Sequence, residues 1–232
     1  MGSNGIILLE GYIMKPLIII NFKTYKESIS ENAVSLAKAA EEVAGQTGVP
    51  VSVAVQAADI FRVKSAVNID VFAQHIDPAG FGAFTGAILP EAAQAAGAIG
   101  SLVNHSEKRM DHEIIGKTVE RMKALGMKSI VCSKDATESE ELARFKPDFI
   151  AYEPPELIGG DVSVSSAAPE VIEETVKRVK AVSPDTQVLA GAGVKTKEDI
   201  DVALRLGAVG VLLASGVTKA ENPKEAILGL IE

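Results

Sequence analysis

The sequence lacks the features that mark several classes of protein. Cys132 is its one cysteine, so no internal disulfide can form, and such scarcity is typical of a reducing compartment. No apolar run approaches the roughly 20 residues of a membrane-spanning helix. With 23 Lys and Arg against 31 Asp and Glu, the net charge is −8 and no basic stripe exists to attract nucleic acid or an anionic membrane. We therefore expect a cytoplasmic protein that binds neither nucleic acid nor membrane.

Material for a hydrophobic core, by contrast, is plentiful. Of the 232 residues 47% are hydrophobic and 23% charged, which suffices for one large domain or two small ones. Gly2 and Ser3 after Met1 are typical of an expression vector, and "MKPLIII" from Met14 looks like a second start. We expect residues 1–13 to be such a remnant or a native extension, and residues 14–232 to form the folded domain.

Eight short apolar runs recur along residues 14–232. They are rich in Val, Ile and Ala and show no strict polar alternation, which is typical of strands buried on both faces. The runs begin at Leu17, Val51, Ile69, Ala98, Lys128, Phe149, Gln187 and Val209.

Helical patterns separate these runs. Apolar residues spaced three and four apart follow Ser30, a candidate N-cap, and a second such pattern follows Thr196. Because parallel strands need crossover helices, the order predicts a single-domain α/β protein, a (β/α)8 barrel. The alternative is a doubly wound open sheet, which would have a glycine-rich turn after its first strand. That turn here is "NFKTYKES", without glycine.

Polar residues gather where the predicted strands end. Lys23, His105 and Glu153 each follow a different run, and small-residue turns follow the last two runs as "AGAG" and "LLASG". A barrel carries its chemistry at the C-terminal ends of its strands, so these groups should converge. They are the parts needed for acid–base chemistry beside an anion site.

Six segments together resemble the triosephosphate isomerase family. They are "NFKTY", "GAFTGAILP", "NHSEKR", "AYEPPELIGG", "AGAG" and "GVLLASG", and they occur in order between Met14 and the end. The short loops and the "PPELIGG" form look like the archaeal branch. The resemblance implies a cofactor-free isomerase of glycolysis and gluconeogenesis. It would interconvert D-glyceraldehyde 3-phosphate and dihydroxyacetone phosphate through an enediolate.

The resemblance also implies a role for each site residue. Glu153 matches the general base, His105 the neutral electrophile and Lys23 the electrostatic stabiliser, while Asn21 helps to place the substrate. Lid residues and backbone N–H groups would hold the phosphate; these positions are Ile158, Gly159, Gly193, Ala214 and Ser215.

The phosphate-binding segments depart from the common family pattern. This chain has no tryptophan for the lid, and Gly193 stands where a serine is common. Ala214 and Ser215 replace a pair of glycines. Backbone donors remain possible there.

Other polar residues receive structural interpretations. The resemblance implies that the loop around Phe81 to Thr85 joins subunits into a homodimer or homotetramer, and His75 opens this loop. His112 is expected at the surface, and neither histidine has a second ligand at metal spacing, so no metal is predicted. Cys132 is expected to serve packing and Glu107 a structural ion pair.

Simpler interpretations exist for each motif alone. Lys23 could be a solvated surface cation, "PPELIGG" an ordinary loop and "AGAG" a tight turn. These interpretations together do not explain why all the features fall at the same end of successive strands.

Two other functions stay open: an enzyme acting on another sugar phosphate or on an indole or histidine precursor, and a non-catalytic scaffold. Neither accounts for Lys23, His105 and Glu153 together.

Overall fold

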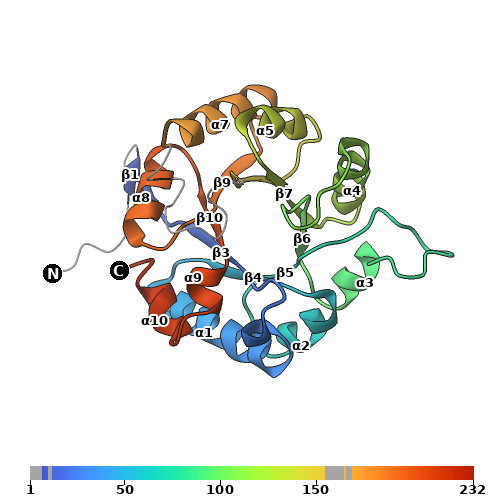
Figure 1. The fold of residues 1–232 in the computed structure, drawn as a ribbon, viewed down its shortest axis with the longest axis horizontal. Helices are drawn as coiled ribbons and strands as arrows, with labels where there is room; N and C mark the ends of the chain where they lie inside the picture. Colours follow the sequence, from blue (N-terminus) through green and yellow to red (C-terminus); the bar gives the residue numbers. More distant parts are fainter. Residues whose placement is uncertain (1–6, 10–11, 155–164, 166–168) are drawn as a thin grey trace.

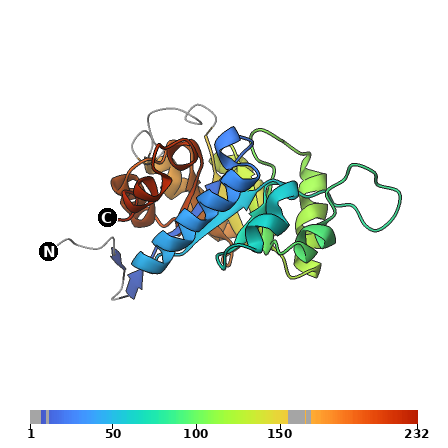
Figure 2. The ribbon, with the colours of Figure 1, turned by 90° about the horizontal axis from the view of Figure 1, so that it is seen from below.

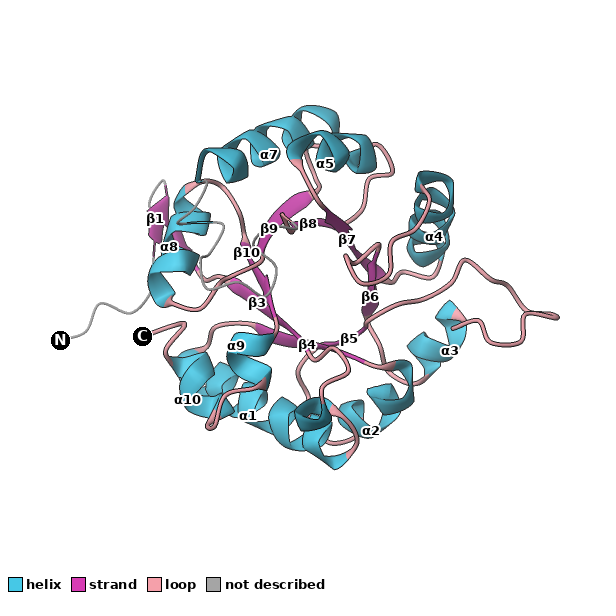
Figure 3. Ribbon diagram, viewed as in Figure 1, coloured by secondary structure: helices cyan, strands magenta, loops and turns pink. Residues whose placement is uncertain are grey.

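Eight parallel strands form a closed barrel in the structure, a computed structural model that describes residues 7–9, 12–154, 165 and 169–232 (Figures 1 and 3). Their order around the barrel is β10-β3-β4-β5-β6-β7-β8-β9, which confirms the predicted single-domain (β/α)8 barrel. The strands are β3 (Leu17–Asn21), β4 (Val51–Val55), β5 (Val71–Ala73), β6 (Gly100–Val103), β7 (Lys128–Ser133), β8 (Phe149–Tyr152), β9 (Gln187–Gly191) and β10 (Gly210–Leu213).

Helices surround the barrel on its outside (Figure 3). The longest described helix follows β3, and two short helices follow β10. They are α1 (Glu31–Thr47), α2 (Ile60–Lys64), α3 (Pro90–Ala95), α4 (His112–Ala124), α5 (Ala136–Ala143), α7 (Pro169–Val182), α8 (Lys197–Arg205), α9 (Ser215–Thr218) and α10 (Pro223–Leu228), with 3₁₀ turns η1 (Lys26–Ser28) and η2 (Ala57–Asp59).

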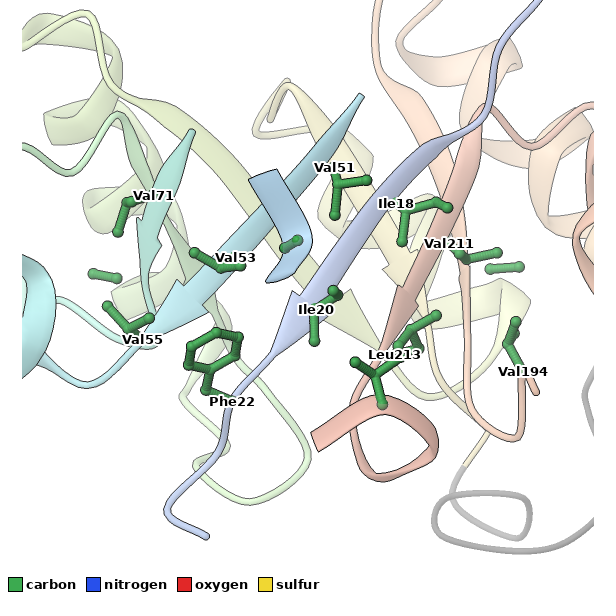
Figure 4. Packing of buried hydrophobic residues seen from close by; sticks show 14 of the residues in the cluster. Ile18, Ile20, Phe22, Val51, Val53, Val55, Val71, Val194, Val211 and Leu213 are labelled. Atoms are coloured by element: carbon green, nitrogen blue, oxygen red, sulfur yellow. The ribbon is translucent and has the colours of Figure 1, made fainter. Parts of the chain in front are cut away.

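The strands divide their side chains between two cores. Ile18 and Ile20 point outward and pack in the cluster shared with the helices, as Figure 4 shows. Ile19 points into the barrel, because successive residues of a strand face opposite sides. Every strand is therefore apolar on both faces. The inner core consists of Ile19, Ala54, Phe72, Leu102, Ile130, Cys132, Ala151, Leu189 and Leu212.

The barrel closes where the last strand meets the first. Gly210 of β10 pairs with Leu17 of β3, and a Cβ atom added at Gly210 would lie 2.0 Å from the Leu17 carbonyl oxygen. Only glycine allows this approach. Closure leaves the barrel without an unpaired sheet edge.

Two helix starts differ in how they are capped. Thr196 forms a full capping box with Asp199 at the start of α8. Ser30 occupies the N-cap position of α1 as predicted, but its side chain makes no capping bond and its φ is 55°. Its N–H instead donates to Asp59 at 3.1 Å, a contact between elements far apart in the sequence.

Residues before the barrel form an antiparallel hairpin. Its strands are β1 (Ile7–Leu9) and β2 (Tyr12–Met14), and β1 lies beside α8 (Figure 1). Residues 1–6 and 10–11 lie outside the described part of the chain, so the division at residue 13 stays a prediction. None of the helices described for the chain combines the length and the hydropathy of a membrane span.

Candidate active site

One pocket lies at the C-terminal ends of the strands and contains the predicted polar residues. Lys23, His105 and Glu153 line it together with Asn21. The predicted phosphate residues Gly193, Ala214 and Ser215 line the same pocket. The structure thus brings together residues that are up to about 190 positions apart in the chain.

Glu153 enters the pocket because of strand geometry. Ala151 points into the barrel, so Glu153, two residues later, takes the same side just past the end of β8. Its N–H donates to the Ser133 carbonyl at 2.8 Å, which continues the ladder by one residue. Neighbouring Gly191 makes room for it, since a Cβ atom there would lie 2.5 Å from the Glu153 Cγ atom.

The Glu153 carboxylate is buried but ionised. Burial by itself raises the pKa of this carboxyl group. The adjacent His105 ring, the Cys132 thiol and the charge of Lys23 outweigh burial, so the pKa of Glu153 lies below its usual value. A carboxylate that is both dry and charged at neutral pH is suited to removing a proton from carbon.

The His105 ring is oriented by a backbone hydrogen bond. Its Nδ1 atom accepts a hydrogen bond from the backbone N–H of Glu107 at 3.2 Å. Because that nitrogen accepts, the proton of the neutral ring belongs on Nε2. Nε2 lies 3.6 Å from the Glu153 Oε1 atom, and the ring is almost fully buried.

Asn21 places a second donor beside this ring. Its Oδ1 atom accepts the N–H of Lys23 at 3.0 Å, which fixes the orientation of the amide. The Nδ2 atom then lies 3.4 Å from His105 Nε2. With the proton on Nε2, two N–H groups face the pocket side by side, where one oxygen of a ligand could accept from both.

Lys23 occupies a constrained position beyond β3. Its φ is 50°, and its carbonyl accepts a bond from the Gln74 side chain at 2.8 Å. The Lys23 Nζ atom lies 2.9 Å from Glu107, and only 13% of the lysine side chain is exposed. Lys23 is therefore no solvated surface cation, and the predicted ion pair of Glu107 is confirmed.

The opposite side of the pocket consists of turns of small residues. Ala192 and Gly193 follow β9 with φ angles of 68° and 72°. Ala214 precedes α9, and Ser215 begins it. The first N–H groups of a helix have no partner within that helix, so this side offers backbone donors to an anion.

Comparison with known proteins agrees with this geometry. The triosephosphate isomerase family model matches residues 16–231. The chain belongs to the triosephosphate isomerase family. It is therefore an enzyme that interconverts glyceraldehyde 3-phosphate and dihydroxyacetone phosphate, a reaction of glycolysis and gluconeogenesis. This assignment replaces the two alternatives that the sequence left open.

Three relatives show the likeness in detail, and each is named triosephosphate isomerase. The one from Methanothermus fervidus is 52% identical over 94% of this chain and 98% of its own. The one from Methanothermobacter thermautotrophicus is 50% identical over 97% and 99%. The one from Methanocaldococcus jannaschii is 49% identical over 93% and 99%. The resemblance to archaeal members of the family is thus confirmed.

Several residues near the isomerase site were not predicted from the sequence. Tyr25 and Lys195 line the pocket, and Lys219 lies 4.1 Å from the centre of the Tyr25 ring. Tyr25 belongs to the quoted "NFKTY" segment, so its position two residues after Lys23 was the available signal. Cys132 lies in the inner core as predicted but also interacts with Glu153, which raises the pKa of its buried thiol further.

The remaining predicted residues lie elsewhere. Ile158 and Gly159 fall outside the described residues, so their contact with the phosphate stays a prediction. His112 begins α4 and is well exposed, as expected, with Glu138 and Glu141 beside it. Among the described residues, no group of three or more His, Cys, Asp or Glu side chains is arranged to hold a metal ion.

Proposed function

We propose that Glu153 is the general base, His105 the neutral electrophile and Lys23 the electrostatic stabiliser of this isomerase. Glu153 takes a proton from the carbon next to the substrate carbonyl, and the C–H electron pair forms the double bond of the enediolate. His105 Nε2–H and Asn21 donate to the oxygens that gain charge, and Lys23 offsets that charge. Glu153 then returns the proton to the neighbouring carbon, while the hydroxyl proton passes to the other oxygen through His105 Nε2, so that the carbonyl and the hydroxyl exchange places.

The observation that carries this proposal is the hydrogen bond that His105 Nδ1 accepts from the Glu107 N–H. A ring whose Nδ1 atom accepts the Glu107 N–H presents Nε2–H to the pocket, 3.6 Å from the carboxylate. Donor and base thus face one substrate from the same wall. On the other wall, we assign the backbone of Gly193, Ala214 and Ser215 to the phosphate, because these turns line the same pocket.

Deuterium exchange tests the base directly. In D₂O the parent enzyme should place deuterium from solvent on the product carbon while it isomerises. Glu153→Gln should lose about 10²- to 10⁴-fold in both isomerisation and exchange. The matched control is Glu113→Gln, which alters an exposed glutamate of α4 and should leave both rates unchanged. Isomerisation by Glu153→Gln near the parent rate would remove Glu153 from this role.

We also propose that the enzyme is a homodimer or homotetramer. The loop between β5 and α3 projects from the barrel (Figure 2), and its Phe81 and Phe84 side chains are 80% and 54% exposed. Asp77 fixes the base of the loop by accepting the N–H of Ile88 at 2.7 Å and contacting His75. Burying two such aromatic rings against a second copy would stabilise association.

Sedimentation at several protein concentrations tests the assembly. The parent should sediment as a dimer or tetramer, and the double variant Phe81→Ser, Phe84→Ser should sediment as a smaller species. Phe61→Ser is the comparison, since Phe61 is also exposed but lies on α2. A monomeric parent would refute the proposal. The cytoplasm is the location we propose, because Cys132 is the single thiol and stays reduced there.

A further inference from the structure

Asn104 lies at the end of β6, directly before His105. It is 1% exposed and its φ is 60°, so the chain leaves the strand in the left-handed region. Asparagine tolerates this region better than most residues, and glycine adopts it freely. The backbone conformation alone therefore does not explain why a buried amide occupies this position.

The amide of Asn104 makes two hydrogen bonds. Its Nδ2 atom donates to the Cys132 carbonyl oxygen at 2.9 Å, and its Oδ1 atom accepts the Met110 N–H at 2.9 Å. The first bond crosses from β6 to β7. The second closes the turn from Asn104 to Met110, which carries both His105 and the Glu107 N–H that sets its tautomer.

The bond to β7 reaches the neighbourhood of the base. Asn104 holds the carbonyl of Cys132, and the carbonyl of the next residue of β7, Ser133, accepts the N–H of Glu153 at 2.8 Å. One amide thus connects the turn that carries His105 to the strand that supports Glu153. Arg109 lies near the Cys132 carbonyl, but at 3.5 Å its contact is weaker than that of Asn104.

We propose that Asn104 is a positioning residue for the isomerisation. Its amide holds the turn of His105 against β7, so that His105 Nε2 and Glu153 Oε1 keep their 3.6 Å separation. The proposal rests on the role proposed above for His105. Asn104 itself is not among the residues that line the pocket, so it acts through its neighbour and not on the substrate.

Asn104→Gly removes both bonds and permits the same backbone conformation. The kcat should fall about 10- to 100-fold, because a shift near 1 Å in the electrophile has that effect, while KM changes less than about threefold. Lys146→Gly is the matched control, since Lys146 has a φ of 54° and precedes β8 at the opposite end of the barrel. It should keep the parent kcat. A folded Asn104→Gly enzyme with kcat within about twofold of the parent would overturn the proposal, whatever its melting temperature.

Asn104→Asp tests the two hydrogen bonds of the amide separately. A carboxylate can accept the Met110 N–H but cannot donate to the Cys132 carbonyl. Because the link to β7 is the proposed device, this variant should lose as much kcat as Asn104→Gly. A parent-like kcat would show that closing the turn suffices and would refute the link.

A double-mutant cycle distinguishes positioning from general weakening of the fold. His105→Gln alone should lose about 10²- to 10³-fold in kcat if the ring is the electrophile. Once the ring is gone, adding Asn104→Gly should change kcat by less than about twofold, since coupled residues are non-additive. Fully additive losses would overturn the positioning role. A parent-like His105→Gln would instead refute the role of His105, so the two failures are distinguishable.

Discussion

The two walls of the pocket are built from different parts of the chain. One wall consists of buried side chains, Lys23, His105 and Glu153, whose charge and direction are set by further bonds. The other consists of turns around Gly193 and Ser215, where the useful groups belong to the backbone. Proton transfer needs a side chain of defined pKa, which few residue types have. A phosphate accepts hydrogen bonds from backbone N–H groups, which almost any residue has. Substitutions should therefore reduce enzyme activity far more on the first wall.

Among substitutions that keep a carboxylate at position 153, Lys23→Met should have the largest effect. It removes the cation next to an anionic substrate and a more anionic transition state, so kcat/KM should fall about 10²- to 10³-fold. Steady-state assays in both directions measure this. Lys26→Met is the control, because its side chain is 88% exposed and should leave kcat/KM unchanged. A loss below tenfold would show that the cation is not part of the side-chain wall.

Glu153→Asp tests the position of the base and keeps its charge. The shorter side chain withdraws the carboxylate by roughly 1 Å, which should reduce kcat about 10²-fold with little change in KM. The variant should fold normally, as judged by circular dichroism and melting temperature. Near-parent turnover would mean that the exact place of Glu153 is unimportant.

Gly191→Ala tests whether Glu153 needs the space left by the absence of a side chain at position 191. A Cβ atom would approach the Glu153 Cγ atom to 2.5 Å and the Tyr152 carbonyl to 3.1 Å, so the carboxylate must move. We expect about a tenfold loss in kcat. Gly45→Ala in α1 is the control, since a Cβ atom there meets no other atom within 4 Å. Equal kcat for the two variants would contradict the packing argument.

The pH profile tests the electrostatics of this wall. In spite of burial, the pKa of Glu153 lies below its usual value of 4.5, chiefly because of His105 and in smaller part because of the charge of Lys23. The base is ionised above that lowered pKa, and kcat/KM is lost as the pH falls through it. Removing the cation raises the pKa, so the acid limb of kcat/KM in Lys23→Met should move to higher pH. An unmoved limb, or one at lower pH, would assign the lowered pKa to other groups.

Ser215→Ala should have the smallest effect. The substitution removes a hydroxyl but leaves the backbone N–H, so KM should rise less than about threefold, the scale of one modest hydrogen bond. The KM for glyceraldehyde 3-phosphate measures this. An increase beyond tenfold would show that the phosphate wall also depends on a side chain and would remove the contrast between the walls.

Local patterns were enough to predict one part of this architecture. The position of the strand ends predicted that Lys23, His105 and Glu153 converge, and all three line the pocket. The apolar runs and crossover helices likewise predicted the closed barrel. These features depend on residues that are neighbours in sequence.

Contacts between strands were beyond such patterns. The hydrogen bond from the Glu153 N–H to the Ser133 carbonyl and the fit of Glu153 beside Gly191 depend on the register of adjacent strands. The absence of a capping bond from the Ser30 side chain has a similar origin. The turn at Ser30 is held instead by a hydrogen bond from its N–H to Asp59 of a different βα unit. Nothing local in the sequence indicates which residue of a neighbouring strand will lie opposite.

The seam between β3 and β10 has a consequence for biosynthesis. Leu17 emerges from the ribosome long before its partner Gly210. Until then the growing sheet has two edges with unpaired N–H and C=O groups, which are templates for aggregation. Closing so long a loop also makes the final step slow, because the contact is remote in sequence. A chain released before Gly210 would retain both edges, so the last βα unit decides whether the earlier seven yield a barrel or a substrate for chaperones and proteases.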